Sequence, residues 1–214
     1  VTVDRDSTQT THFGSKLCRH FEHVNLLEQR FFLDHRSLFK VIPPEPVTLK
    51  VAVNDDSISS WFTDVVVGTQ SVRSKFFLDL IKTDQENAIK LMADAKISAA
   101  VSTSDAPLPG FICYLLGQHI YRATASPDFA KRYFSNGVTV EALLKAPSVR
   151  FDAEDKLRRQ WFAKVFDEEL ELPATNIHSA HGIAKICVEG SAWGMNPALI
   201  VDNHIKSGEL IELI

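Results

Sequence analysis

The sequence predicts an α/β fold, because strand-like and helix-like segments alternate along most of its 214 residues. Residues 47–53 alternate between apolar and polar side chains, as a strand does, and residues 57–67 follow with helix-like spacing. Two further apolar runs, 76–81 and 97–101, flank a helix-like segment at 87–93. This β-α-β-α-β order implies parallel strands joined by right-handed crossovers.

Local signals mark the ends of two of these helices. Gly68 is placed to end the helix over 57–67. Thr83 and Glu86 have the spacing of a capping box that opens the helix over 87–93.

A second α/β unit follows the first. Strands are expected at 116–123, 148–151, 175–178 and 210–214. Helices are expected from Ser126 and Pro127 onward, at 138–145, at 155–166 and at 181–188, while Pro197 interrupts the run 195–201. Two such units in tandem predict two lobes with a small-molecule cleft between them.

The composition excludes several classes of protein. The chain is 45% hydrophobic and 23% charged, as in an ordinary globular protein, and no run approaches the roughly 18 apolar residues of a membrane span. A net charge of -4 argues against nucleic-acid binding by this chain alone. The N-terminus has no signal-peptide pattern, and the three cysteines, Cys18, Cys113 and Cys187, fit a reducing cytoplasm.

An apolar stripe runs along the N-terminal segment. Its members recur every three or four residues and predict an amphipathic helix over 13–31: Phe13, Leu17, Phe21, Val24, Leu27 and Phe31. Two interpretations remain open, a surface helix lying on its own domain or a pairing helix in a dimer. Proline-rich residues 41–46 then break the helix and predict a stiff hinge.

Polar residues gather at the predicted strand ends, where open α/β sheets bind small ligands. The candidate binding residues are Asn54, Asp55, Asp56, Ser57, Ser102, Thr103, Phe151, Asp152, Ser179 and His181. Hydroxyls and helix N-termini suit the carboxylate of a free amino acid, and aspartates suit its ammonium or a cationic side chain. Phe151 is suited to cover an aliphatic stem.

Each of these residues also has a purely structural interpretation. Asp56 or Ser57 would serve as a helix N-cap, worth about 1 kcal/mol. Ser102 and Thr103 would be ordinary turn residues, and Asp152 would cap the next helix. Metal binding is not expected, because the pairs His178/His181 and His20/His23 lack an obvious third ligand.

The sequence contains no phosphate-binding loop, no nucleophile elbow and no dinucleotide fingerprint. We therefore expect neither an enzyme nor a bound cofactor.

Several segments, in order along the chain, resemble one family. They are Val51 to Ser57 with Trp61, Asp128 to Thr139, Ala142 to Pro147 with Phe151 and Asp152, and Ser207 to Ile211. Together they are similar to the LysR-type transcriptional regulators, in the lysine/arginine-responsive ArgP/IciA (LysG-like) group. Ser135 departs from a proline common in the family's motif, and 191–197 depart from its Gly-rich strand, with Trp193 expected near the pocket.

The resemblance implies two Rossmann-like lobes of the type II periplasmic-binding-protein kind, preceded by a long linker helix. The expected division is a dimerising linker helix and hinge over 1–45, lobe I over 46–115 and lobe II over 116–214, with lobe I lacking its final strand and helix. Implied partners are lysine or arginine as effector, a second copy in a homodimer or homotetramer, RNA polymerase, and DNA through a helix-turn-helix that this sequence does not include. The alternatives are a stand-alone amino-acid-binding module of the solute-binding type, or an inactive truncated regulator.

Overall fold

The computed structural model describes most of the chain from residue 47 onward. The described residues are 2–3, 8–9, 11, 13–14, 16–18, 20–21, 24, 27–28, 31, 47–69, 76–94, 96–103, 109, 111–168 and 170–214. They form two compact units. Unit 1 comprises Val1–Asn54 with Gly68–Cys113, and unit 2 comprises Asp55–Val67 with Tyr114–Ile214. The proline-rich hinge predicted at 41–46 lies outside the described residues.

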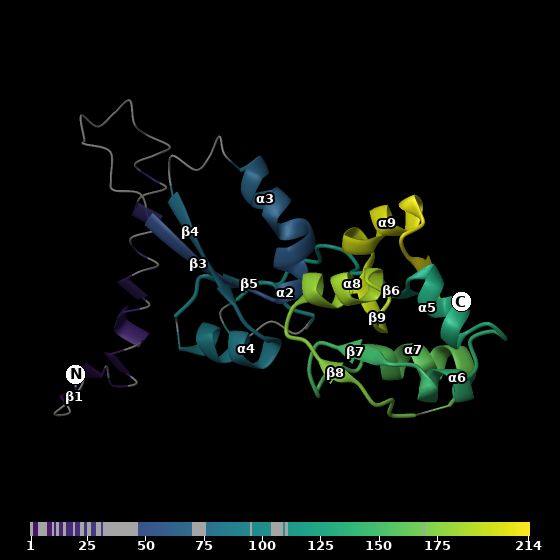
Figure 1. Cartoon of the computed structure of the whole chain (residues 1–214). Helices are drawn as coiled ribbons and strands as arrows, with labels where there is room; N and C mark the ends of the chain where they lie inside the picture. Colours follow the sequence, from purple (N-terminus) through teal and green to yellow (C-terminus); the bar gives the residue numbers. More distant parts are fainter. Residues whose placement is uncertain are drawn as a thin grey trace. The chain divides into compact units, whose positions relative to one another are not determined.

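Unit 1 contains a parallel three-stranded sheet in the order β4-β3-β5 (Figure 1). Its strands are β3 (Val47–Val53), β4 (Phe76–Lys82) and β5 (Ala99–Ala100). Helix α4 (Gln85–Ala93) follows β4, and its Ala88 is buried with Ala52 and Ile97 in a small apolar cluster. The parallel pairing predicted from the alternating pattern is confirmed. A two-residue antiparallel pair, β1 (Thr2–Val3) with β2 (Thr8–Gln9), also belongs to this unit.

The N-cap of α4 is Asp84, one residue after the Thr83 that the capping-box pattern indicated. The Asp84 carboxylate accepts a 2.7 Å hydrogen bond from the backbone amide of Asn87. Thr83 takes part instead through its hydroxyl, which accepts from the Asn87 side chain at 2.8 Å.

Unit 2 contains a mixed five-stranded sheet in the order β10-β6-β9-β7-β8. Its strands are β6 (Tyr121–Ala125), β7 (Ser148–Arg150), β8 (Thr175–Asn176), β9 (Trp193–Pro197) and β10 (Ile211–Glu212). Strand β6 runs antiparallel to both of its neighbours, whereas β7 is parallel to both β8 and β9.

Helices α5 to α9 lie in the same unit as this sheet (Figure 1). They are α5 (Pro127–Tyr133), α6 (Val140–Lys145), α7 (Leu157–Phe166), α8 (Ala180–Val188) and α9 (Ala198–Ser207). Two apolar clusters form the core, one around Phe129, Phe162 and Trp193, the other around Ile183 and Val201. Trp193 is fully buried beside Trp161, with ring centroids 5.4 Å apart, so it is a core residue rather than part of a pocket wall.

The helical segment after β3 begins two residues earlier than predicted. It consists of α2 (Asp55–Ser57), a π-helical turn η1 (Ile58–Phe62) and α3 (Thr63–Gly68). Through its contacts, Asp55–Val67 groups with unit 2 although it follows a strand of unit 1.

One strand prediction in unit 2 was wrong in position, and one helix of this unit was not predicted. The strand expected at 116–123 begins only at Tyr121, and residues 111–120 have neither helix nor strand, with Leu115 94% exposed. Helix α9 was not predicted, because Pro197 is typical of a helix breaker. Proline is tolerated just before and within the first turn of a helix, and here Pro197 ends β9 and serves as the N-cap residue of α9.

The predicted helix over 13–31 is helical at every position between those limits that the structure describes. Its apolar stripe faces outward: Phe13, Phe21 and Leu27 are 74%, 60% and 67% exposed. Among the described residues, no helix is long and apolar enough to cross a membrane.

Candidate functional site

Three of the predicted site residues follow neighbouring strands of unit 1. Asn54 comes directly after β3, and Ser102 and Thr103 lie just beyond β5. The two strands are adjacent and parallel, and the Val101 amide donates a 2.9 Å hydrogen bond to the Ala52 carbonyl. Both groups therefore lie at the same edge of the sheet, as parallel strand ends must.

Asp55 binds the first turn of helix α8 in unit 2. Its carboxylate accepts a 2.6 Å hydrogen bond from the backbone amide of Ala180 (α2 and α8 in Figure 1). Ser179 is the N-cap of this helix and accepts from the Gly182 amide at 3.1 Å. A carboxylate is favoured there by the unpaired amides and the positive end of the helix dipole.

Asp56 lies against Tyr121 and His119. The Tyr121 hydroxyl donates a short hydrogen bond to Oδ2 of Asp56. The rings of His119 and Tyr121 are 5.0 Å apart, and Nε2 of His119 is buried with no hydrogen-bond partner among the described residues. These three side chains form a half-buried polar group that we call the Asp56 cluster.

The Asp56 cluster has distinctive electrostatics. Burial raises the pKa of Asp56 above its ordinary value, while the hydrogen bond from Tyr121 and the nearby His119 act to lower it. Asp55 and Asp155 add two negative charges that raise the pKa of Asp56 further. Burial also lowers the pKa of His119 and raises that of Tyr121 far above its usual range. A positive charge placed beside Asp56 would relieve this crowding of carboxylates.

Phe151 directly follows β7, and its ring lies edge-on to that of His178, with ring centroids 5.6 Å apart. The residue that organises this turn is Asp155, which accepts from the amides of Phe151 at 3.1 Å and Leu157 at 2.9 Å. The structural interpretation of Asp152 as the cap of the next helix was therefore wrong. Asp152 is half-buried and directly follows Phe151, whose backbone amide donates to Asp155.

Two more predicted residues have local roles that the structure clarifies. Ser57 is 3% exposed and has helical backbone angles, so it is not the N-cap of this helix. His181 is exposed in the first turn of α8. Within the described part of the chain, no group of three or more His, Cys, Asp or Glu is arranged to hold a metal ion.

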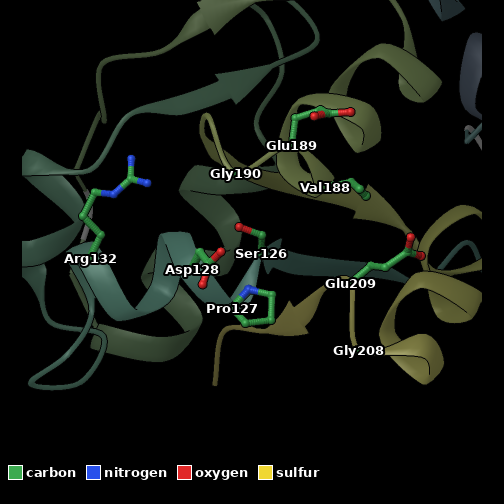
Figure 2. Close-up of a pocket in the computed structure, with 9 residues that line it drawn as sticks. All are labelled: Ser126, Pro127, Asp128, Arg132, Val188, Glu189, Gly190, Gly208 and Glu209. Carbon is green, nitrogen blue, oxygen red and sulfur yellow. The ribbon is translucent and has the colours of Figure 1, made fainter.

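A separate hollow of about 480 Å³ opens elsewhere in unit 2 (Figure 2). The start of α5 and the ends of α8 and α9 line it, with Asp128, Glu189, Glu209 and Arg132 at its walls. Gly190 has φ +67 there, and an added Cβ would lie 2.8 Å from Oγ of Ser126, so the close approach requires glycine. None of the predicted site residues lines this hollow.

Three participants in the site were missed by sequence reasoning: His119, Tyr121 and Asp155. Tyr121 is 65 positions from Asp56, and no local pattern connects them. The sequence signal for Tyr121 was only that it fell within a predicted strand.

Solved structures place this fold among known regulators. The C-terminal domains of a LysR family protein from Agrobacterium tumefaciens are similar, with TM-score 0.75 and 35% identity over 78% of this chain and 81% of that one. ArgP from Mycobacterium tuberculosis gives TM-score 0.82 and 26% identity, over 96% of this chain and 68% of that one. No protein-family model matches the chain. The two α/β units thus define the effector-binding domain of a LysR-type regulator.

Relatives identified by sequence place the chain in one group of LysR-type regulators. The transcriptional regulator ArgP of Pseudomonas fluorescens Pf-5 is 32% identical over 211 residues, which are 95% of this chain and 67% of that protein. ArgP of Pseudomonas aeruginosa PAO1 is 32% identical over 223 residues, or 100% of this chain and 70% of that protein. The chain belongs to the LysR family, in the ArgP/LysG-like group. This family comprises transcriptional regulators, which confirms the expectation that the chain is not an enzyme.

Proposed function

We propose that this chain senses a basic amino acid, lysine or arginine, for a LysR-type regulator. The observation that carries the proposal is the concentration of carboxyl groups around the Asp56 cluster, where Asp55 and Asp155 lie close enough to raise the pKa of Asp56. Carboxylates recognise the cationic groups of such an effector. LysG of Corynebacterium glutamicum, solved with bound Arg, makes arginine a natural test compound.

In this proposal the binding residues are those expected from the sequence. Asp55, Asp56, Phe151 and Asp152 face the cationic and aliphatic parts of the effector. Polar contacts come from the remaining members of the set: Asn54, Ser57, Ser102, Thr103, Ser179 and His181. The proposal keeps the division expected from the sequence, a linker helix and hinge over 1–45 and lobes over 46–115 and 116–214, except that Asp55–Val67 groups with unit 2.

Effector binding acts by changing the population of conformations. A ligand shifts such an equilibrium only by its different affinity for the two states. The exposed apolar stripe of the N-terminal helix supports pairing with a second copy, since a seam of this spacing suits helix–helix packing. DNA binding belongs to a helix-turn-helix outside this sequence, with RNA polymerase as a further partner, and the regulator acts in the cytoplasm.

Thermal unfolding of the purified protein with added ligand tests this proposal. A ligand present at about 100 times its Kd stabilises the folded state by about 2.7 kcal/mol. Lysine or arginine should therefore raise the Tm by about 5 °C or more, at roughly 2–4 °C per kcal/mol for a chain of this size. Glutamate, which places a third charge of the wrong sign beside Asp55 and Asp56, should leave the Tm unchanged. Equal shifts with all three amino acids would contradict the proposal.

A further inference from the structure

Tyr121 is the first residue of strand β6. It pairs in register with Pro197 of β9, and the neighbouring Ile120 carbonyl accepts a 2.9 Å hydrogen bond from the Ala198 amide. The ring stacks at a tilt on His119. The hydroxyl is therefore presented to Asp56 by a sheet, which fixes side-chain positions better than a loop does.

Asp56 is held from its own side as well. Its backbone carbonyl accepts a 2.5 Å hydrogen bond from the Ser60 hydroxyl, within the helical segment 55–67. Its carboxyl oxygen Oδ2 is taken by Tyr121. The other oxygen, Oδ1, accepts no hydrogen bond from a described residue. Among the described residues, Oδ1 is also not one of the fully buried polar atoms that lack a partner. One oxygen of the carboxyl is thus held by Tyr121, while the other accepts from no described residue.

We propose that Tyr121 is a positioning residue that orients the Asp56 carboxyl, through Oδ2, so that Oδ1 receives the cationic group of the effector. This inference rests on the proposed function and adds a residue that the sequence did not indicate. Tyrosine suits the role because its hydroxyl donates one hydrogen bond and carries no charge to compete with the effector. A lysine or arginine at position 121 would neutralise Asp56 permanently.

The same contact sets the pH range in which Asp56 is charged. The groups facing Asp56 are Asp55 on its own helix, His119, Tyr121 of β6 and Asp155 of the turn before α7. Burial and the two aspartates raise the pKa of Asp56, whereas Tyr121 and His119 lower it. Removing the Tyr121 hydroxyl should therefore raise this pKa further, so that the carboxylate is lost at a higher pH.

The test compares Tyr121→Phe with Tyr133→Phe, a control whose half-buried ring packs against Phe129. Carbon-13 NMR of the Asp56 carboxyl, titrated without ligand, should give a higher pKa in Y121F than in the unmodified protein, and no change in Y133F. Titration calorimetry with lysine should then show a Y121F affinity loss that grows as pH falls. At low pH the loss should reach about tenfold if the pKa of Asp56 rises by one.

Two kinds of failure can be told apart. An unchanged Asp56 pKa in Y121F, or an affinity loss that is the same at every pH, would overturn the role of Tyr121. If the unmodified protein binds neither lysine nor arginine at any pH, the proposed function fails. The NMR comparison would still decide whether Tyr121 controls the carboxyl. Should Y121F fail to fold, His119→Gln gives a second variant, for which the Asp56 pKa should also rise.

Discussion

Asp55 and Ala180 are 125 positions apart in the chain, yet the Asp55 carboxylate accepts a 2.6 Å hydrogen bond from the Ala180 amide. One side chain thereby ties the helical segment after β3 to the first turn of α8. Such charge-assisted contacts at helix N-termini are among the stronger hydrogen bonds in proteins.

We expect Asp55→Ala to destabilise the protein by about 1 kcal/mol, the usual cost of losing a carboxylate that caps a helix. Urea unfolding would measure this loss. Asp64→Ala, which removes an exposed carboxylate from α3 of the same helical segment, is the matched control and should change stability far less. Equal effects of the two substitutions would mean that the Asp55 contact contributes nothing specific.

Asp56 should make the protein less stable as pH rises, whereas a typical salt-bridged aspartate makes a protein more stable as pH rises. Its folded-state pKa is raised above 3.8, chiefly by burial, so folding favours the protonated form. The resulting contribution to stability is fully present below pH 3.8 and is lost as pH rises through the folded-state pKa. Asp56→Asn, which cannot ionise, should therefore be more stable than the unmodified protein at pH 8.

Urea unfolding from pH 4 to pH 8 checks this expectation. The stability gain of D56N should shrink as the pH falls toward 4, because the raised pKa of Asp56 lets the unmodified carboxyl take up a proton more readily than a free aspartate does. A gain that does not vary with pH would show that the Asp56 charge is not the cause.

Arg158 has a buried guanidinium group, and the Ser148 hydroxyl is one of its two hydrogen-bond acceptors. The side chain is 3% exposed and donates to Oγ of Ser148 at 2.5 Å and to the Leu172 carbonyl at 3.2 Å, while its Nε has no partner among the described residues. Burial is the main cause that lowers the pKa of Arg158. Ser148→Ala would remove an acceptor from this guanidinium and should cost about 1–3 kcal/mol.

Differential scanning calorimetry would measure that loss, with exposed Ser135→Ala as the control. A Tm for S148A equal to that of S135A would contradict the assigned role.

The apolar stripe of the N-terminal helix predicts self-association. Phe21→Glu places a charge in the middle of the stripe and should convert the protein to a smaller species in size-exclusion chromatography with light scattering. Lys16→Glu changes the charge at an exposed position outside the stripe and should leave the mass unchanged. A monomeric unmodified protein would show that the stripe does not pair copies of this chain.

Short-range patterns predicted much of the fold. Alternation in 47–53 predicted β3, and Ser126 with Pro127 predicted the start of α5, where the Ser126 hydroxyl accepts from the Phe129 amide at 3.2 Å. These features depend on residues within one turn of each other. Helix α9 was missed because the same pattern, Pro197 before apolar residues, is compatible with either a break or a helix start.

The site was only half predictable for a related reason. The placement of Asp55 and Asp56 at a strand end follows from the β3 pattern alone. Their partners Tyr121 and Ala180 come from distant segments that only the folded sheet and helix α8 bring near. Hydrogen bonds across 65 and 125 positions leave no periodic trace in a single sequence.

In the proposed function, Asp56 receives a cationic group of a basic amino acid. Isothermal titration of lysine and arginine into the unmodified protein and into D56N, at pH 8, tests this role most directly, with D64N as the control. We predict saturable binding of at least one of them by the unmodified protein and by D64N. For D56N we predict a loss of about tenfold or more in affinity, as expected when one charge-assisted hydrogen bond is removed. Equal affinity of D56N and the unmodified protein, or no heat with either amino acid, would contradict it.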